Sequence, residues 1–215
     1  MRAHLLLEEV VGEKLPVQLK LEKRIPVGGG LGGGSADAAA MLLAVRDLFM
    51  LDLTNEDLAG LAMRLGSDVA YCLGTGAAVV EGLGDQIERM PPAGGDLVLV
   101  LPGFGCPTGQ VYRAYDDAPV ALRAEAVREM AGTGVVESGR LFNDLCPAAE
   151  RVVPALAEIR EEVGAVAEAP VHMTGSGSTL FVWCEGGAEH ALLLRDALHG
   201  ELDDCAVVAT RLACR

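Results

Sequence analysis

The feature that most constrains this chain is a seven-residue segment, 28–34, in which six residues are glycine. Before it, apolar and polar side chains alternate over residues 17–21. That pattern predicts a half-buried strand of an antiparallel sheet, which Pro26 ends. After it comes an alanine- and leucine-rich stretch, which predicts a helix with Ser35 as its N-cap and Asp37 in its first turn. The glycines therefore form a tight connection between a strand and a helix.

Such a connection suits a phosphate group. Glycine reaches positive φ and lets backbone N–H groups approach an anion closely. The following helix adds unpaired N–H groups and the positive end of its dipole. A flexible linker is the alternative, but a linker is rarely flanked by a strand and an alanine-rich helix. The predicted cofactor-binding residues are Pro26, Val27, Gly28, Gly29, Gly30, Leu31, Gly32, Gly33, Gly34, Ser35 and Ala36.

Two common phosphate loops fit less well. Gly28, Gly30 and Gly33 satisfy the G-x-G-x-x-G fingerprint of dinucleotide-binding folds, which alone is a weak signal. That fold requires a fully buried parallel strand beforehand, whereas the residues here alternate. The Walker loop is excluded because no Gly-Lys-Ser/Thr follows the glycines.

Net charge and cysteine content limit which binding partners and which cellular compartment we expect for this chain. The formal net charge is −14, so nucleic acid and anionic membranes are poor candidates. No apolar run reaches membrane-spanning length and the first residues carry acids, so we expect a cytoplasmic protein. The six cysteines form no C-x-x-C pair and no histidine lies at zinc-finger spacing, which favours reduced thiols and no protein-held metal.

Helices and strands interleave without a regular repeat, which predicts an α+β fold of two subdomains. The proline- and glycine-rich residues 91–95 mark the boundary. We expect one domain at residues 1–93 and another at 94–215. Thr54 and Asp57 resemble a capping pair that opens a helix, which Gly66 ends. The other expected helices are 2–11, 120–131, 148–163 and 189–199, and the expected later strands are 77–81, 86–90, 97–101, 171–174, 179–184 and 206–212.

Several segments resemble one family. PVGGGLGGGSADAAA is similar to the P-x-x-x-G-L-G-[SG]-[SG]-S-A motif of the GHMP family of small-molecule kinases. RLGSDVAYCLGTGAAVVEGLGD, PTGQVYRAYD, FNDL and HMTGSGSTLF resemble later family segments in the same order and spacing. The resemblance implies an N-terminal part like ribosomal S5 domain 2, a ferredoxin-like C-terminal part, and transfer of the ATP γ-phosphoryl group to a hydroxyl of a small alcohol.

The same resemblance implies roles for particular residues. Asp68 would be the catalytic aspartate, although a solvated aspartate after a helix would look the same in sequence. Thr108 would contact the substrate, or it could N-cap a helix. Gly175, Ser176 and Gly177 would face the active site, or they could form a plain hairpin turn. Asn143 is as suited to bracing loops as to touching ligand. ATP chemistry implies Mg²⁺, with no ligand identified beyond a guess at Ser35.

The family also begins with a strand bearing P-A-K-x-N-L-x-L, which has no counterpart here. The resemblance therefore implies a fold that lacks its first strands, and we expect that Met1 is not the natural start of the folded unit. Within the family the implied acceptor is 4-diphosphocytidyl-2-C-methyl-D-erythritol. Homoserine, mevalonate and an inactive nucleotide-binding chain are the alternatives. An alternating strand short of neighbours also predicts self-association, for example as a homodimer.

Overall fold

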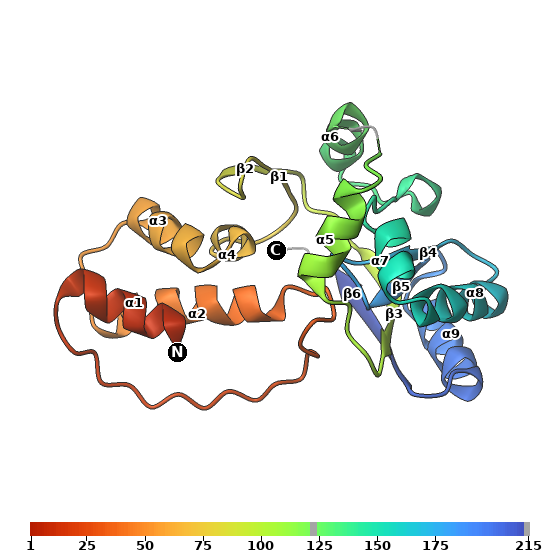
Figure 1. The fold of residues 1–215 in the computed structure, drawn as a ribbon, viewed down its shortest axis with the longest axis horizontal. Coiled ribbons are helices and arrows are strands. Elements are labelled where there is room, and N and C mark those ends of the chain that lie inside the picture. Colours follow the sequence, from red (N-terminus) through yellow and green to blue (C-terminus); the bar gives the residue numbers. More distant parts are fainter. Residues whose placement is uncertain (121–123, 213–215) are drawn as a thin grey trace. The chain divides into compact units, whose positions relative to one another are not determined.

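The computed structural model describes residues 1–120 and 124–212, which form two compact units. The N-terminal unit consists of Met1–Arg24 and Gly32–Met90. The C-terminal unit consists of Ile25–Leu31 together with the described residues from Pro91 onward. Helices and strands interleave along the chain, as expected for an α+β protein (Figure 1). The first half of the glycine segment thus packs with the C-terminal unit, which the sequence did not indicate.

The N-terminal unit packs helices around a leucine- and alanine-rich core. Thr54 and Asp57 form a reciprocal capping box at the start of one helix, and Gly66 ends it, as the sequence predicts. Leu7, Leu42 and Leu58 are fully buried between the helices. The elements are α1 (Arg2–Val11), α2 (Gly33–Leu48), α3 (Asn55–Leu65), α4 (Ser67–Cys72) and an antiparallel pair, β1 (Ala78–Glu81) and β2 (Gln86–Arg89).

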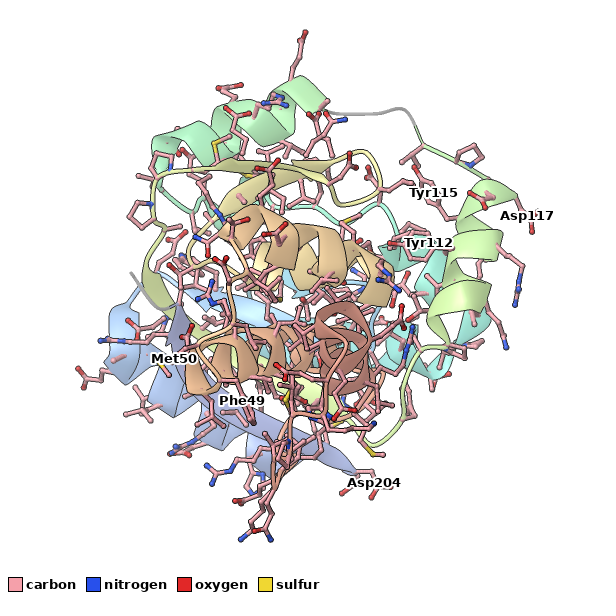
Figure 2. All side chains as sticks on the ribbon, turned by 90° about the vertical axis from the view of Figure 1, so that its left-hand side faces the viewer. Phe49, Met50, Tyr112, Tyr115, Asp117 and Asp204 are labelled. Carbon is pink, nitrogen blue, oxygen red and sulfur yellow. The ribbon has the colours of Figure 1, made fainter. Side chains whose placement is uncertain are left out.

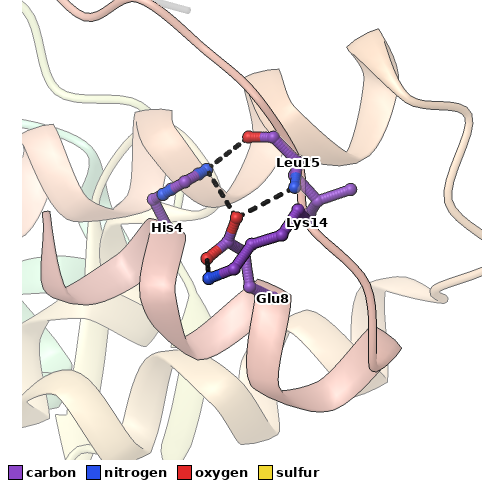
Figure 3. Close-up of polar contacts among 4 residues, drawn as sticks. All are labelled: His4, Glu8, Lys14 and Leu15. Carbon is purple, nitrogen blue, oxygen red and sulfur yellow. Dashed lines mark hydrogen bonds and ion pairs between the residues drawn. The ribbon is translucent and has the colours of Figure 1, made fainter.

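Polar contacts hold the chain that leaves α1 against that helix (Figure 3). Glu8 accepts hydrogen bonds from Lys14 Nζ and from the Leu15 backbone N–H, both at 2.9 Å. The Leu15 carbonyl lies 2.6 Å from His4 Nε2. The hydrogen bond from Lys14, followed by that from Leu15, lowers the pKa of Glu8 below its ordinary value. These contacts anchor Leu15, whose side chain is buried, at the start of a long irregular segment.

The strand expected at residues 17–21 is not formed. Residues 13–24 contain no helix or strand, and Leu19 and Leu21 are 54% and 51% exposed. The described strands make two sheets, β1-β2 and β4-β5-β3-β6, and neither includes this segment. An alternating pattern yields a strand only when another strand accepts its backbone hydrogen bonds. Figure 1 shows the segment as an irregular stretch after α1.

The C-terminal unit is built on a four-stranded antiparallel sheet of order β4-β5-β3-β6. Val98, Val100, Leu180 and Val182 on the central strands are fully buried in its core. The elements are β3 (Gly95–Pro102), α5 (Thr108–Asp116), α6 (Ala124–Thr133), a 3₁₀ turn η1 (Ser138–Arg140), α7 (Cys146–Val152), α8 (Ala155–Ala167), β4 (Val171–Met173), β5 (Leu180–Cys184), α9 (Gly187–Glu201) and β6 (Cys205–Leu212).

Two helix predictions for this unit need correction. The single helix expected at residues 148–163 is two helices, because Pro154 lacks an N–H and Val153 before it is not helical, with φ −133°. The helix expected at 120–131 is α6, which begins at Ala124; Val120 lies outside it, and residues 121–123 fall outside the described residues.

Local features place some side chains unusually. Trp183 on β5 lies over Gly95 of β3, and its indole ring fills the space that a side chain at residue 95 would need. Met50, labelled in Figure 2 next to Phe49, has φ +50° where the chain turns after α2 and is 89% exposed. Within the described ranges, none of the helices has the length and apolar character needed to cross a membrane.

Candidate functional site

The glycine segment adopts the backbone that a phosphate loop needs. Gly28, Gly30 and Gly32 have φ of +79°, +74° and +65°, a left-handed conformation that side chains rarely adopt. They alternate with residues that do not have positive φ. Alternation of this kind turns successive N–H groups toward one concave side, which is a known anion-binding arrangement. Gly33, the last glycine of the G-x-G-x-x-G match, is the first residue of α2 and does not have positive φ.

Close packing also explains why glycine stands at position 30 and at position 175. The Gly29 carbonyl accepts a hydrogen bond from the Thr179 N–H at 3.2 Å, and the Gly30 carbonyl accepts one from the Thr174 hydroxyl at 3.1 Å. A Cβ at Gly30 would collide with the Thr174 carbonyl oxygen, and one at Gly175 would lie 2.7 Å from the Gly30 carbonyl oxygen. Thr174 and Thr179 were not singled out from the sequence, although both lie in the HMTGSGSTLF segment.

Helix α2 begins without a side-chain cap. Its N-cap is Gly32, and the Gly32 carbonyl accepts the first intrahelical hydrogen bond, from the Ala36 N–H at 2.9 Å. The expectation that Ser35 is the N-cap is therefore wrong: Ser35 lies inside the first turn, because glycine already supplies the bend. Asp37 lies beyond the first turn, where it forms an ion pair with Lys23. The N–H groups at the start of α2 thus have no intrahelical acceptor.

Asp68 lies in the first turn of the short helix α4 and is exposed. Its carboxylate accepts a hydrogen bond from the Ser67 hydroxyl at 3.1 Å. The turn between β1 and β2 packs against this position, since a Cβ at Gly84 would lie 2.9 Å from the Ser67 carbonyl carbon. Asp68 therefore presents a solvent-accessible carboxylate next to a backbone that packs against the β1–β2 turn.

The turn after β4 gathers several of the predicted residues. The Thr108 and Ser176 hydroxyls are 2.9 Å apart, and Ser176 is only 9% exposed. Thr108 is not the N-cap of α5, because Pro107 holds that position and Thr108 is the first helical residue. A Cβ at Gly177 would lie 2.9 Å from Cys106 Sγ. The structure therefore brings Thr108, Gly175, Ser176, Gly177 and the first half of the glycine segment together in the C-terminal unit.

Asn143 braces this turn. Its Nδ2 atom donates hydrogen bonds to the carbonyls of Met173 and Gly175 at 2.9 and 2.7 Å. Its Oδ1 atom accepts one from the Leu145 N–H at 2.9 Å. Of the two possibilities that the sequence left open for Asn143, these contacts are those of a loop brace.

The described residues include no group of three or more His, Cys, Asp and Glu side chains that could hold a metal ion. The five described cysteines are free thiols. Burial, followed by the nearby charge of Glu150, raises the pKa of Cys146 to about 11, so that thiol is protonated at neutral pH.

Comparison with known proteins agrees with this geometry. Residues 1–80 match the GHMP kinases N terminal domain. The 4-diphosphocytidyl-2-C-methyl-D-erythritol kinase of Rhizobium etli is 38% identical over 218 residues, covering 98% of this chain and 71% of the relative. The enzyme of the same name from Desulfitobacterium hafniense is 38% identical over 183 residues, and the match spans 80% of this chain and 61% of that relative.

Solved structures give the same result. A crystal structure of 4-(cytidine 5'-diphospho)-2C-methyl-D-erythritol kinase superposes with a TM-score of 0.79 at 35% identity, covering 98% of this chain and 76% of that one. Homoserine kinase from Cytophaga hutchinsonii gives a TM-score of 0.74 at 19% identity, which is a likeness of fold. The fold and the glycine segment define a GHMP-type kinase architecture. The chain belongs to the GHMP kinase family, and within it to the group of the 4-diphosphocytidyl-2-C-methyl-D-erythritol kinases.

Proposed function

We propose that this chain binds ATP and transfers its γ-phosphoryl group to a hydroxyl of 4-diphosphocytidyl-2-C-methyl-D-erythritol. The observation that carries the proposal is the glycine segment, whose three positive-φ glycines lead into the uncapped start of α2. The identity to kinases of that name supports the choice of acceptor. The chain spans 61% of the length of the Desulfitobacterium hafniense relative and 71% of the length of the Rhizobium etli relative.

Phosphoryl transfer requires positioning and charge stabilisation more than covalent chemistry. The N–H groups of residues 28–33 would hold phosphate oxygens, and the positive end of the α2 dipole would favour the same anion. Ser35 in the first turn could add its hydroxyl. Mg²⁺ would arrive with ATP and neutralise phosphate charge.

Asp68 is proposed as the catalytic base. An exposed carboxylate is ionised at neutral pH and can accept the proton of an acceptor hydroxyl. The Ser67 hydroxyl and the fixed backbone of α4 would orient it. Thr108, Gly175, Ser176 and Gly177 are proposed to line the substrate side, where one hydroxyl of the hydrogen-bonded Thr108–Ser176 pair is left to donate.

The location and assembly of the protein are part of the proposal. The free thiols fit a reducing compartment such as the cytoplasm. Exposed apolar side chains follow α1, and they favour self-association, for example as a homodimer. These are Leu19, Leu21, Ile25 and Val27. Light scattering over a range of concentrations tests this: a mass that stays monomeric would contradict it.

The decisive experiment measures binding and transfer separately. Calorimetry should detect ATP binding, and labelled ATP should phosphorylate 4-diphosphocytidyl-2-C-methyl-D-erythritol in preference to homoserine and mevalonate. Preference for homoserine or mevalonate would assign the chain to another branch of the family. Binding of ATP without transfer to any acceptor would indicate a nucleotide-binding chain that is not a kinase. Absence of ATP binding would overturn the proposal.

A further inference from the structure

Asn143 connects its own segment, before α7, to the turn at residues 173–175, about 30 positions further along the chain. It lies between η1 and α7, and its amide N–H₂ group uses both donors on the carbonyls that flank Thr174. Its carbonyl oxygen accepts the Leu145 N–H, which determines which way the amide faces. An asparagine side chain is suited to this arrangement because it offers two donors and an acceptor at once. A carboxylate would place negative charge against two carbonyl oxygens.

Thr174 passes this constraint on to the glycine segment. Its hydroxyl donates to the Gly30 carbonyl at 3.1 Å. Its own carbonyl accepts the Gly177 N–H at 3.0 Å, and its N–H donates to the Thr179 carbonyl at 3.0 Å. Thr179 in turn donates its N–H to the Gly29 carbonyl. All these residues belong to the C-terminal unit, so they form one continuous network.

We propose that Asn143 is a positioning residue for the phosphate loop, which it orients through Thr174 without touching the nucleotide. The proposal rests on the proposed ATP-binding function of the glycine segment. The Gly29 and Gly30 carbonyls are fixed by Thr179 and Thr174. Because those two carbonyls face the turn after β4, the N–H groups of the glycine segment stay turned toward the anion. Loss of the brace at Asn143 should let the turn at residues 174–177 move and release the loop.

The test compares Asn143→Asp and Thr174→Val with a matched control, Thr133→Ala. Thr133 lies in the same unit, where its hydroxyl bridges the Met130 carbonyl and the Val135 N–H near the end of α6. The first readout is hydrogen exchange in the absence of nucleotide. Both test variants should raise exchange at residues 28–33 more than in α9, whereas the control should not. This readout does not depend on ATP binding.

The second readout is the dissociation constant for ATP. Each test variant should raise it by about tenfold, the usual worth of one well-placed hydrogen bond. The double variant should weaken binding by less than the product of the two single effects, because both act on one network. Thr174→Ser keeps the hydroxyl and should restore most of the affinity. The KM for ATP should rise more than kcat falls.

The results distinguish failure of the positioning role of Asn143 from failure of the proposed ATP-binding function. Unchanged exchange at residues 28–33 in both test variants, with melting temperatures lowered as in Thr133→Ala, would overturn the positioning role. If the parent protein does not bind ATP but the test variants still show faster exchange at these residues, Asn143 positions the loop and the proposed ATP-binding function is wrong. Should Asn143→Asp fail to fold, Asn143→Ala takes its place, since it removes both amide donors without adding charge, and Thr174→Val tests the link to Gly30 separately.

Discussion

The Thr174 hydroxyl donates a hydrogen bond to the Gly30 carbonyl across 144 positions of the sequence. Gly30 cannot carry a side chain there, because a Cβ would meet the Thr174 and Gly177 carbonyls. Gly30 therefore both shapes the glycine segment, through its positive φ, and allows that segment to pack on the turn after β4. Loop conformation and loop position depend on the same residue.

Gly30→Ala should weaken ATP binding at least tenfold and lower the melting temperature. Alanine in the left-handed region costs about 1–2 kcal/mol, and the collision with Thr174 adds to this. The matched control is Gly200→Ala in α9, where no atom lies within 4 Å of an added Cβ. The control should leave ATP affinity as it is and slightly raise stability. Equal ATP affinity in both variants by calorimetry would contradict ATP binding by the glycine segment.

Asp68→Asn should keep ATP affinity within a few-fold and cut turnover by about two to four orders of magnitude, the usual contribution of a general base. Asparagine keeps the shape but cannot accept a proton. Asp52→Asn, an exposed aspartate of the same unit, is the control and should retain turnover. The measurement is steady-state phosphorylation alongside calorimetry. If Asp68→Asn keeps most of its kcat, the aspartate is structural.

The folded chain should lose stability as the pH falls below about 6.5, partly through His172. Burial lowers the pKa of this imidazole, which lies 3.2 Å from the Ser138 hydroxyl. The unfolded chain therefore takes up the proton first, and the stability that neutral His172 contributes is present above its ordinary pKa and lost as the pH falls through the folded one.

Urea unfolding between pH 7.5 and 5.5 tests this, with His172→Gln as the test variant. That variant should show a flatter dependence of stability on pH. Ser138→Ala removes the hydroxyl but keeps the imidazole, so it should retain the slope of the parent protein. A slope that His172→Gln leaves unchanged would assign the dependence to other groups.

Cys146 should react with iodoacetamide at pH 8 roughly two orders of magnitude more slowly than an ordinary thiol, because only the thiolate attacks. Its pKa is raised to about 11 by burial and then by Glu150, whose carboxylate lies 3.8 Å from Sγ. Glu150→Gln removes that charge and should speed the reaction. Peptide mass spectrometry follows the label. A parent Cys146 that alkylates as fast as free cysteine would show that the thiol is not protected.

The sequence predicted those parts of the fold that depend on residues close together in the chain. The Thr54–Asp57 capping box and Gly66 delimit α3 where they predict, since capping depends on residues a few positions apart. Residues 17–21 have an equally clear pattern and form no strand, because pairing depends on a neighbour that no pattern within the segment can supply. Pro154 divides a predicted helix in two, which its fixed φ and missing N–H should have indicated.

The same distinction applies to the candidate site, where local features were predictable and long-range contacts were not. A glycine segment ahead of a helix could be read directly, and Gly28, Gly30 and Gly32 have the expected positive φ. The exact role of each residue could not. Ser35 was expected to cap α2, yet Gly32 does so, and Thr174 gave no signal because its partner is the backbone of Gly30. Contacts to a distant backbone carbonyl leave no trace in residue spacing.

The position of Trp183 over Gly95 gives this protein a built-in optical probe. Trp183 is the single tryptophan of the chain, and its ring reaches from β5 over Gly95 of the neighbouring strand β3. Its fluorescence will respond when β3 and β5 separate and the indole meets water. The helices α1–α4 dominate the N-terminal unit, so loss of their circular dichroism reports on that unit as well. Two melting curves recorded by these signals coincide only if the two units unfold together.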